Sequence, residues 1–207
     1  MEIVGTFLEW LLGLLSPGIA ERIRRRRISR ETIPAIAREI EELGLTLALL
    51  AWRVRSYQET ADATFASWLA RYVDEYRGSD QNEPAIKQLH DPARILNDGR
   101  AWRRRGPEHG LDLKEYSLSL LNANMAHLAS CPPDFCSSVL HLKGQLDLLN
   151  ADSRAANADA RKTFDSSLSS ENRAALMVNQ MRFYQLIAER AVSMADKARE
   201  IATSYRS

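Results

Sequence analysis

The sequence is poor in the residues that β-structures and extracellular domains need. Its 207 residues include only 9 glycines, 7 prolines and 2 cysteines. Scarce glycine and proline leave few tight turns, and no useful length of chain alternates apolar with polar residues, which argues against a sheet. Two cysteines five residues apart make no disulfide framework, so we expect a reducing cytoplasm.

An excess of charge of one sign is also missing. The 28 basic and 27 acidic residues leave a net charge of +1, so no overall field attracts nucleic acid or an acidic partner. There is no glycine-rich phosphate loop, no G-x-S-x-G and no H-E-x-x-H. No E-x-x-H pair supports a di-iron bundle. The sequence therefore predicts no cofactor and favours a non-catalytic protein over an enzyme.

No apolar run is long enough to cross a membrane unaided. The most apolar segment, residues 2–16, would form a helix of about 22 Å, against the ~30 Å of a bilayer's hydrocarbon core. Glu9 lies in its middle, so spanning would need local thinning or oligomerisation. A cleaved signal peptide fits poorly, because the basic residues follow the apolar run instead of preceding it.

The chain has helical periodicity instead. Apolar side chains alternate steps of four and three over more than four heptads, a pattern typical of a coiled-coil seam. The positions are Ile36, Ile40, Leu43, Leu47, Leu50, Val54, Tyr57, Ala61, Thr64 and Trp68. We expect one helix over 33–76, roughly 65 Å long. Gly44 would either allow another backbone to approach closely or split this helix.

The second half of the chain predicts further helices. Asp112, with Glu115 three residues on, forms a capping box that would start a helix running to about Ser130. After a proline turn, helices over about 133–167 and 170–205 would form an antiparallel hairpin about 50 Å long.

The stretch between these parts, at about 78–111, is the least regular. Proline and cap signals there indicate short helices near 84–90 and 92–104. Connections of this length often carry binding function.

We therefore predict an all-α fold: an elongated antiparallel helical bundle with long heptad-bearing helices and a short amphipathic N-terminal helix. The chain divides into 1–30, an apolar amphipathic helix with a basic run, and 31–207, a helical bundle domain. Pro17-Gly18 is expected to break the helix and hold the first part apart from the bundle.

The N-terminal segment carries the clearest candidate for attachment. Its apolar residues at three-and-four spacing are Phe7, Trp10, Leu11 and Leu14. Six arginines in nine residues follow, among them Arg24, Arg25, Arg26 and Arg27. This arrangement is typical of a peripheral membrane anchor, in which each arginine near anionic headgroups adds about 1 kcal/mol. The alternatives are docking onto a protein partner or a second copy, and binding to phosphate backbones.

The tightest cluster of metal-capable side chains is His127, Cys131, Cys136 and His141. Two cysteines and two histidines can form a closed tetrahedral zinc site. The last two lie about 140° apart around a helix, so a distorted turn would be needed. The alternative is two small buried cysteines at a hairpin turn, with the histidines exposed or hydrogen-bonded.

A second basic patch comprises Arg100, Trp102, Arg103, Arg104 and Arg105, with His109 soon after. Such a patch can hold single-stranded nucleic acid by charge and stacking, or can simply be a basic surface segment. An arginine followed four to six residues later by histidine also resembles the short signature of the all-helical HEPN-type ribonucleases. The resemblance implies that His109 acts in acid–base catalysis and Arg104 holds the scissile phosphate. Gly106-Pro107 interrupts the stretch, and another arginine replaces the polar residue usual after the first.

These features predict a non-catalytic helical scaffold, adaptor or complex subunit, tethered through its N-terminal segment to a membrane surface or protein partner. We expect it in the cytoplasm, at the inner face of the membrane, with a protein partner or a second copy of itself. The alternative is a nucleic-acid-directed protein, either a backbone-binding subunit or a HEPN-like ribonuclease. If Arg24–Arg27 and Arg103–Arg105 shared one face, a polyanion would be favoured; separate faces favour the anchor.

Overall fold

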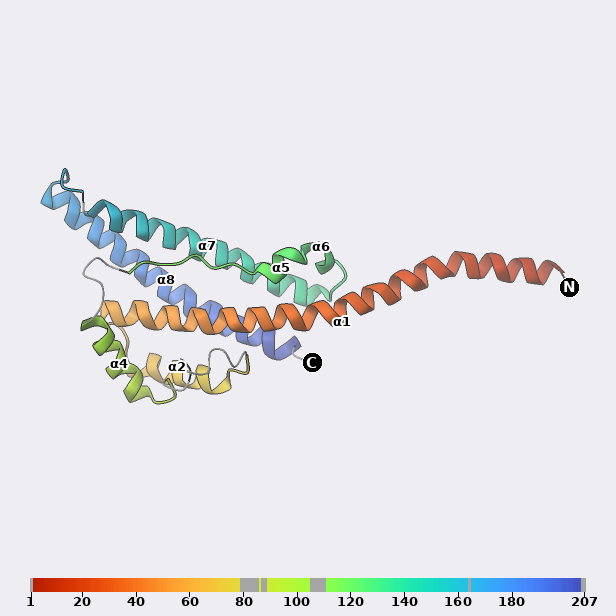
Figure 1. Cartoon of the computed structure of the whole chain (residues 1–207), viewed down its shortest axis with the longest axis horizontal. Coiled ribbons are helices and arrows are strands. Elements are labelled where there is room, and N and C mark those ends of the chain that lie inside the picture. The colour runs from red at the N-terminus through yellow and green to blue at the C-terminus, as the bar shows by residue number, and fades with distance from the viewer. Residues whose placement is uncertain (1, 79–85, 87–88, 105–110, 164, 206–207) are drawn as a thin grey trace.

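A computed structural model describes residues 2–78, 86, 89–104, 111–163 and 165–205, with side chains described from residue 30 onward except at 102–104. Every regular element in this part of the chain is a helix (Figure 1), which confirms the all-α prediction. The elements are α1 (Glu2–Gln58), α2 (Ala63–Glu75), α4 (Pro92–Arg104), α5 (Ser119–Ala123), α6 (Met125–Leu128), α7 (Pro133–Thr163) and α8 (Ser170–Tyr205).

The core lies where α1 packs against the α7–α8 hairpin. Fully buried side chains include Ile36, Ile40, Leu47 and Val54 on α1, Phe135, Val139 and Leu149 on α7, and Tyr184, Ile187 and Ala191 on α8. The predicted helices over 133–167 and 170–205 match α7 and α8 closely. Ser169 caps the N-terminus of α8, because its hydroxyl accepts a hydrogen bond from Asn172 N at 3.2 Å.

The prediction of one helix over 33–76 is wrong, because α1 ends at Gln58 and α2 folds back beside it. Glu59 has a φ of 59°, the left-handed conformation that often terminates a helix. Asp62 then caps α2 by accepting a hydrogen bond from Phe65 N at 2.8 Å. The apolar rhythm runs on through these residues, so the periodicity concealed the turn.

Gly44 does not split α1 but allows the close approach that was the other expectation. A Cβ at this position would overlap the Tyr72 hydroxyl of α2 and lie 2.9 Å from Ala198 Cβ of α8. The Tyr72 hydroxyl donates to Ala195 O at 3.1 Å, deep in the interior. The glycine therefore lets α1, α2 and α8 meet at one point.

The helix predicted to begin at Asp112 does not form there. Residues 111–118 are extended, and the short helices α5 and α6 follow. The capping-box signal was overridden by hydrogen bonds from distant side chains, described below. The helix predicted over 92–104 is confirmed as α4, whereas most of 84–90 lies outside the described residues.

The predicted break at Pro17-Gly18 is also wrong, because α1 runs without interruption from Glu2. A proline inside a helix removes one main-chain hydrogen bond, and a helix can continue through it with a bend. Figure 1 shows α1 curving within its N-terminal part. The short N-terminal helix is thus the first portion of α1.

Candidate functional site

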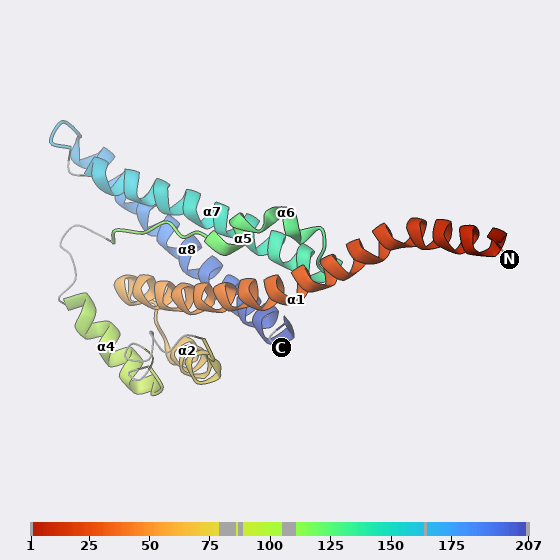
Figure 2. The ribbon, with the colours of Figure 1, turned by 45° about the vertical axis from the view of Figure 1, so that its right-hand side comes forward.

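The first candidate is the N-terminal arm, which we define as residues 2–29 of α1. At about 1.5 Å per residue, the arm accounts for roughly 42 Å of helix. It projects away from the bundle, and Figures 1 and 2 agree that no other described helix lies beside it. Among the side chains of α1 that are described, from residue 30 onward, the first fully buried one is Ile36. Phe7, Trp10, Leu11, Leu14 and Arg24–Arg27 therefore belong to the part of the α1 backbone that projects from the bundle.

The described part of the second basic patch, on the α4 backbone from Arg100 to Arg104, lies near the opposite end of α1 (Figure 1). Helix α4 packs there, since Trp52 Nε1 donates to Ile95 O at 3.2 Å and Gly99 lies against Ser56. About 25 residues of α1, or roughly 38 Å, separate this point from Arg27. The two basic clusters are therefore on separate parts of the molecule.

The residues of the ribonuclease-like signature are mostly not described. Arg100 is exposed on α4, but the side chains of Trp102, Arg103 and Arg104 are not described. Arg105 and His109 lie outside the described residues altogether. The structure therefore gives no distance between Arg104 and His109, and their pairing in a HEPN-like site stays a prediction.

The structure does not bring the four zinc candidates together. No group of three or more histidine, cysteine, aspartate or glutamate side chains in the described chain is arranged to hold a metal ion. The Cys131 thiol donates to His127 O at 3.7 Å, and the Cys136 thiol donates to Leu128 O at 2.8 Å. His127 and His141 are exposed. Both thiols thus fasten the turn between α6 and α7.

Sequence reasoning missed a set of paired hydrogen bonds from distant side chains to the main chain of the segment 111–118, which we call the clamps. Asn150 of α7 accepts a hydrogen bond from Tyr116 N at 2.9 Å and donates to Tyr116 O at 2.8 Å. Asn157 makes the same pair of hydrogen bonds to Leu113: it accepts from Leu113 N at 3.1 Å and donates to Leu113 O at 2.7 Å. Each amide side chain therefore replaces the main chain of a neighbouring β-strand.

The spacing of the clamps explains why two asparagines suffice. They are seven residues apart, which is about 10.5 Å along one side of a helix. The three residues from Leu113 to Tyr116 span about 10 Å of extended chain. A third clamp lies on α8, where the Tyr184 hydroxyl accepts from Leu111 N at 3.0 Å and donates to Leu111 O at 3.1 Å. The segment is thereby fixed along the bundle.

The end of this segment is fixed by Glu39 of α1. Its carboxylate accepts hydrogen bonds from Leu120 N at 2.7 Å, Leu121 N at 2.9 Å and the Ser119 hydroxyl at 3.1 Å. The N–H groups of Leu120 and Leu121 lie in the first turn of α5, where the helix itself offers them no partner. A cap provided by a residue eighty positions away has no local sequence signal. The clamps and the cap give the segment a structural role.

Burial raises the pKa of the tyrosines that take part in these contacts. It does so for Tyr72, Tyr184 and Tyr116, in each case because the anion would lose its hydration. The protonated hydroxyls of Tyr72 and Tyr184 donate to Ala195 O and Leu111 O.

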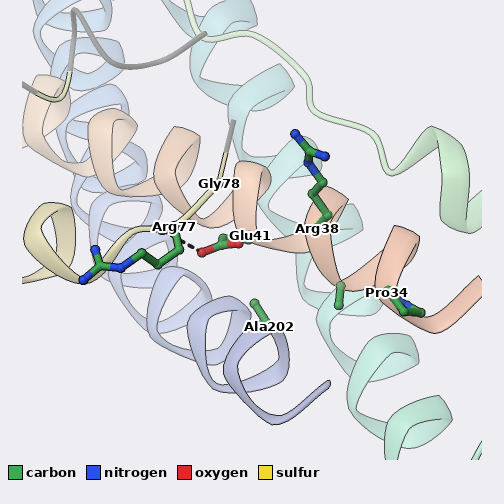
Figure 3. A pocket seen from close by; sticks show the side chains of 7 residues that line it. Pro34, Arg38, Glu41, Arg77, Gly78 and Ala202 are labelled. Carbon is green, nitrogen blue, oxygen red and sulfur yellow. Dashed lines mark hydrogen bonds between the residues drawn. The ribbon is translucent and has the colours of Figure 1, made fainter. Parts of the chain in front are cut away.

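A cavity of about 310 Å³ lies between α1 at Pro34–Glu41, the residues that follow α2 and Ala202 of α8 (Figure 3). Its wall includes Glu41, whose carboxylate accepts a hydrogen bond from Arg77 N at 3.0 Å. The guanidinium of Arg77 donates instead to Asp74 O and Tyr76 O. In Figure 3 the side chains of Arg38 and Arg77 point away from one another, so they form no cradle for an anion.

No protein-family model, no curated protein and no solved structure matches this chain. No described helix is long and apolar enough to cross a membrane.

Proposed function

We propose that this protein is a non-catalytic helical adaptor that attaches to an anionic membrane surface through its N-terminal arm and holds its bundle beside that surface. One observation carries the proposal: the arm continues α1 beyond the bundle without another described helix against it. Its apolar and arginine residues are then available to an external surface.

The arm has the composition that an interfacial helix needs. Burying a residue such as Phe7, Trp10 or Leu14 contributes roughly 1.5–3 kcal/mol. Each arginine near anionic headgroups contributes about 1 kcal/mol more. An apolar helix with a neighbouring basic run lies in the plane of the interface, and the continuity of α1 joins this anchor rigidly to the bundle.

The separation of the basic clusters favours this function over nucleic-acid binding. A polyanion tracked along one face would contact Arg24–Arg27 and the α4 patch together, but about 38 Å of α1 lies between them. A membrane surface needs only the arm.

Vesicle flotation of the full-length protein tests the proposal. We expect it to float with vesicles containing phosphatidylserine, to bind phosphatidylcholine vesicles much less, and to dissociate as salt rises because the arginines are screened. Deletion of residues 1–30 should abolish flotation.

The matched control is Val178→Asp, which changes an apolar residue on α8 that is 69% exposed. This variant should float as the wild type does. Flotation that survives the deletion, or wild-type protein that binds RNA but neither type of vesicle, would overturn the membrane assignment.

A further inference from the structure

The outer side of α7 carries an apolar row that no described helix covers. Leu140 is 46% exposed and Leu148 is 50% exposed. Gly144, Ala151 and Ala158 continue the row and are also exposed. In chain order the row is Leu140, Gly144, Leu148, Ala151 and Ala158, and steps of four, four, three and seven residues keep these positions on one side of the helix. The opposite side of α7 holds Phe135, Leu142 and Leu149 in the core.

The middle of this row is flat enough for another helix to approach. A Cβ added at Gly144 would meet no atom within 4 Å. Leucines at two levels, separated by glycine and alanine, provide the knobs and the holes of close helix packing. Single exposed leucines need no explanation, but an exposed row with this spacing is the pattern of a helix–helix seam.

Charges along both edges of the row decide what fits it. On one edge Asp147, which forms an ion pair with Lys143, is 63% exposed, and Arg154, which forms an ion pair with Glu115, is 58% exposed. On the other edge His141 is exposed, and Asp159 is 17% exposed and lies 3.9 Å from the Lys162 ammonium group. The midpoint of each pair falls at about residue 150, and so does the midpoint of Leu148 and Ala151. If a second copy of α7 lies antiparallel with its residue 150 beside residue 150 of the first, each acidic position therefore faces a basic or histidine position.

We propose that this face of α7 binds the same face of a second copy, antiparallel and centred near residue 150. Leu148 of each copy then packs beside Ala151 of the other, and Gly144 beside Ala155. Asp147 of each copy faces Arg154 of the other, and His141 faces Asp159. The contact is self-complementary, as a two-fold dimer interface must be.

The apolar contacts supply the affinity, and the charges fix the direction. Exposed ion pairs contribute little to stability, but placing like charges opposite one another disfavours the parallel arrangement and shifted registers. A dimer also carries two N-terminal arms, so a surface that binds one arm weakly holds the dimer more tightly. The dimer itself does not depend on membrane binding.

Light scattering of the full-length protein over a range of concentrations, without lipid or detergent, tests the interface. We expect a wild-type mass approaching twice that of one chain. Leu148→Glu should weaken dimerisation by more than ~tenfold, because it places a buried charge in the seam. Val178→Asp is the control and should leave the mass unchanged, as should Trp10→Asp with Leu14→Asp in the arm.

A charge exchange tests the antiparallel register. Asp147→Arg should weaken association by placing two arginines opposite one another, and Asp147→Arg with Arg154→Asp should restore it. Circular dichroism should show each variant folded. A wild-type monomer at all concentrations, a Leu148→Glu dimer of undiminished affinity, or no recovery in the double variant would overturn the proposal.

Discussion

Replacing both Asn150 and Asn157 by alanine should lower the free energy of unfolding by about 3–5 kcal/mol. Each asparagine makes two hydrogen bonds to the extended segment, and each leaves a main-chain N–H and C=O without a partner when it is removed. Asn150 is buried, so water replaces its bonds poorly. Urea unfolding followed by circular dichroism measures the loss.

The exposed Asn179 of α8 provides the control, and Asn179→Ala should change stability by less than about 0.5 kcal/mol. Trypsin gives an independent readout. The exposed Lys114 lies between the clamped residues, and cleavage after it should accelerate once the clamps are removed. A double variant that unfolds within about 1 kcal/mol of the wild type would show that the clamps do not hold the segment.

Valine at Gly44 should cost about 3 kcal/mol, because its side chain has no space between α1, α2 and α8. The Tyr72 hydroxyl and Ala198 Cβ occupy the position that the new carbons need. For a chain of this size, the loss corresponds to a fall in melting temperature of roughly 6–12 °C. Differential scanning calorimetry measures it directly.

Gly144→Val in a Leu148→Glu background is the matched control, because a Cβ at this helical glycine would meet no atom of its own chain within 4 Å and the glutamate removes the proposed dimer contact. Its stability should stay within about 0.5 kcal/mol of the Leu148→Glu variant, since valine is a slightly better helix former than glycine. Removing the Tyr72 hydroxyl should relieve part of the crowding, so Gly44→Ala should be better tolerated in a Tyr72→Phe background. Equal costs at the two glycines would contradict the packing described here.

The parts of the fold that sequence predicted correctly have local signals. Helices α7 and α8 begin at a proline and at a capping serine beside long apolar rows, and α4 begins at Pro92. The missed turn before α2 has a local signal too, the cap Asp62, but Tyr57, Ala61 and Thr64 continue the apolar rhythm across it. Periodicity alone therefore predicted a single helix where the structure has two, α1 and α2.

The extended segment could not be predicted, because its hydrogen-bond partners are distant in sequence. Asp112 and Glu115 have the spacing of a capping box, but Tyr184, Asn157 and Asn150 provide stronger, fixed partners for the main chain around them. Composition identified the N-terminal arm as a candidate anchor. The exposed row on α7 became visible only when the structure showed which side of that helix faces the core.

The most direct test of the account is to replace Trp10 and Leu14 of the arm by aspartate and to measure vesicle binding and the melting temperature of the same preparation. We expect the variant to dissociate from phosphatidylserine vesicles while its bundle melts at the wild-type temperature, because the arm projects from the bundle. A large fall in melting temperature in detergent-free solution would contradict it. Such a fall would show that the arm packs within the protein's own core.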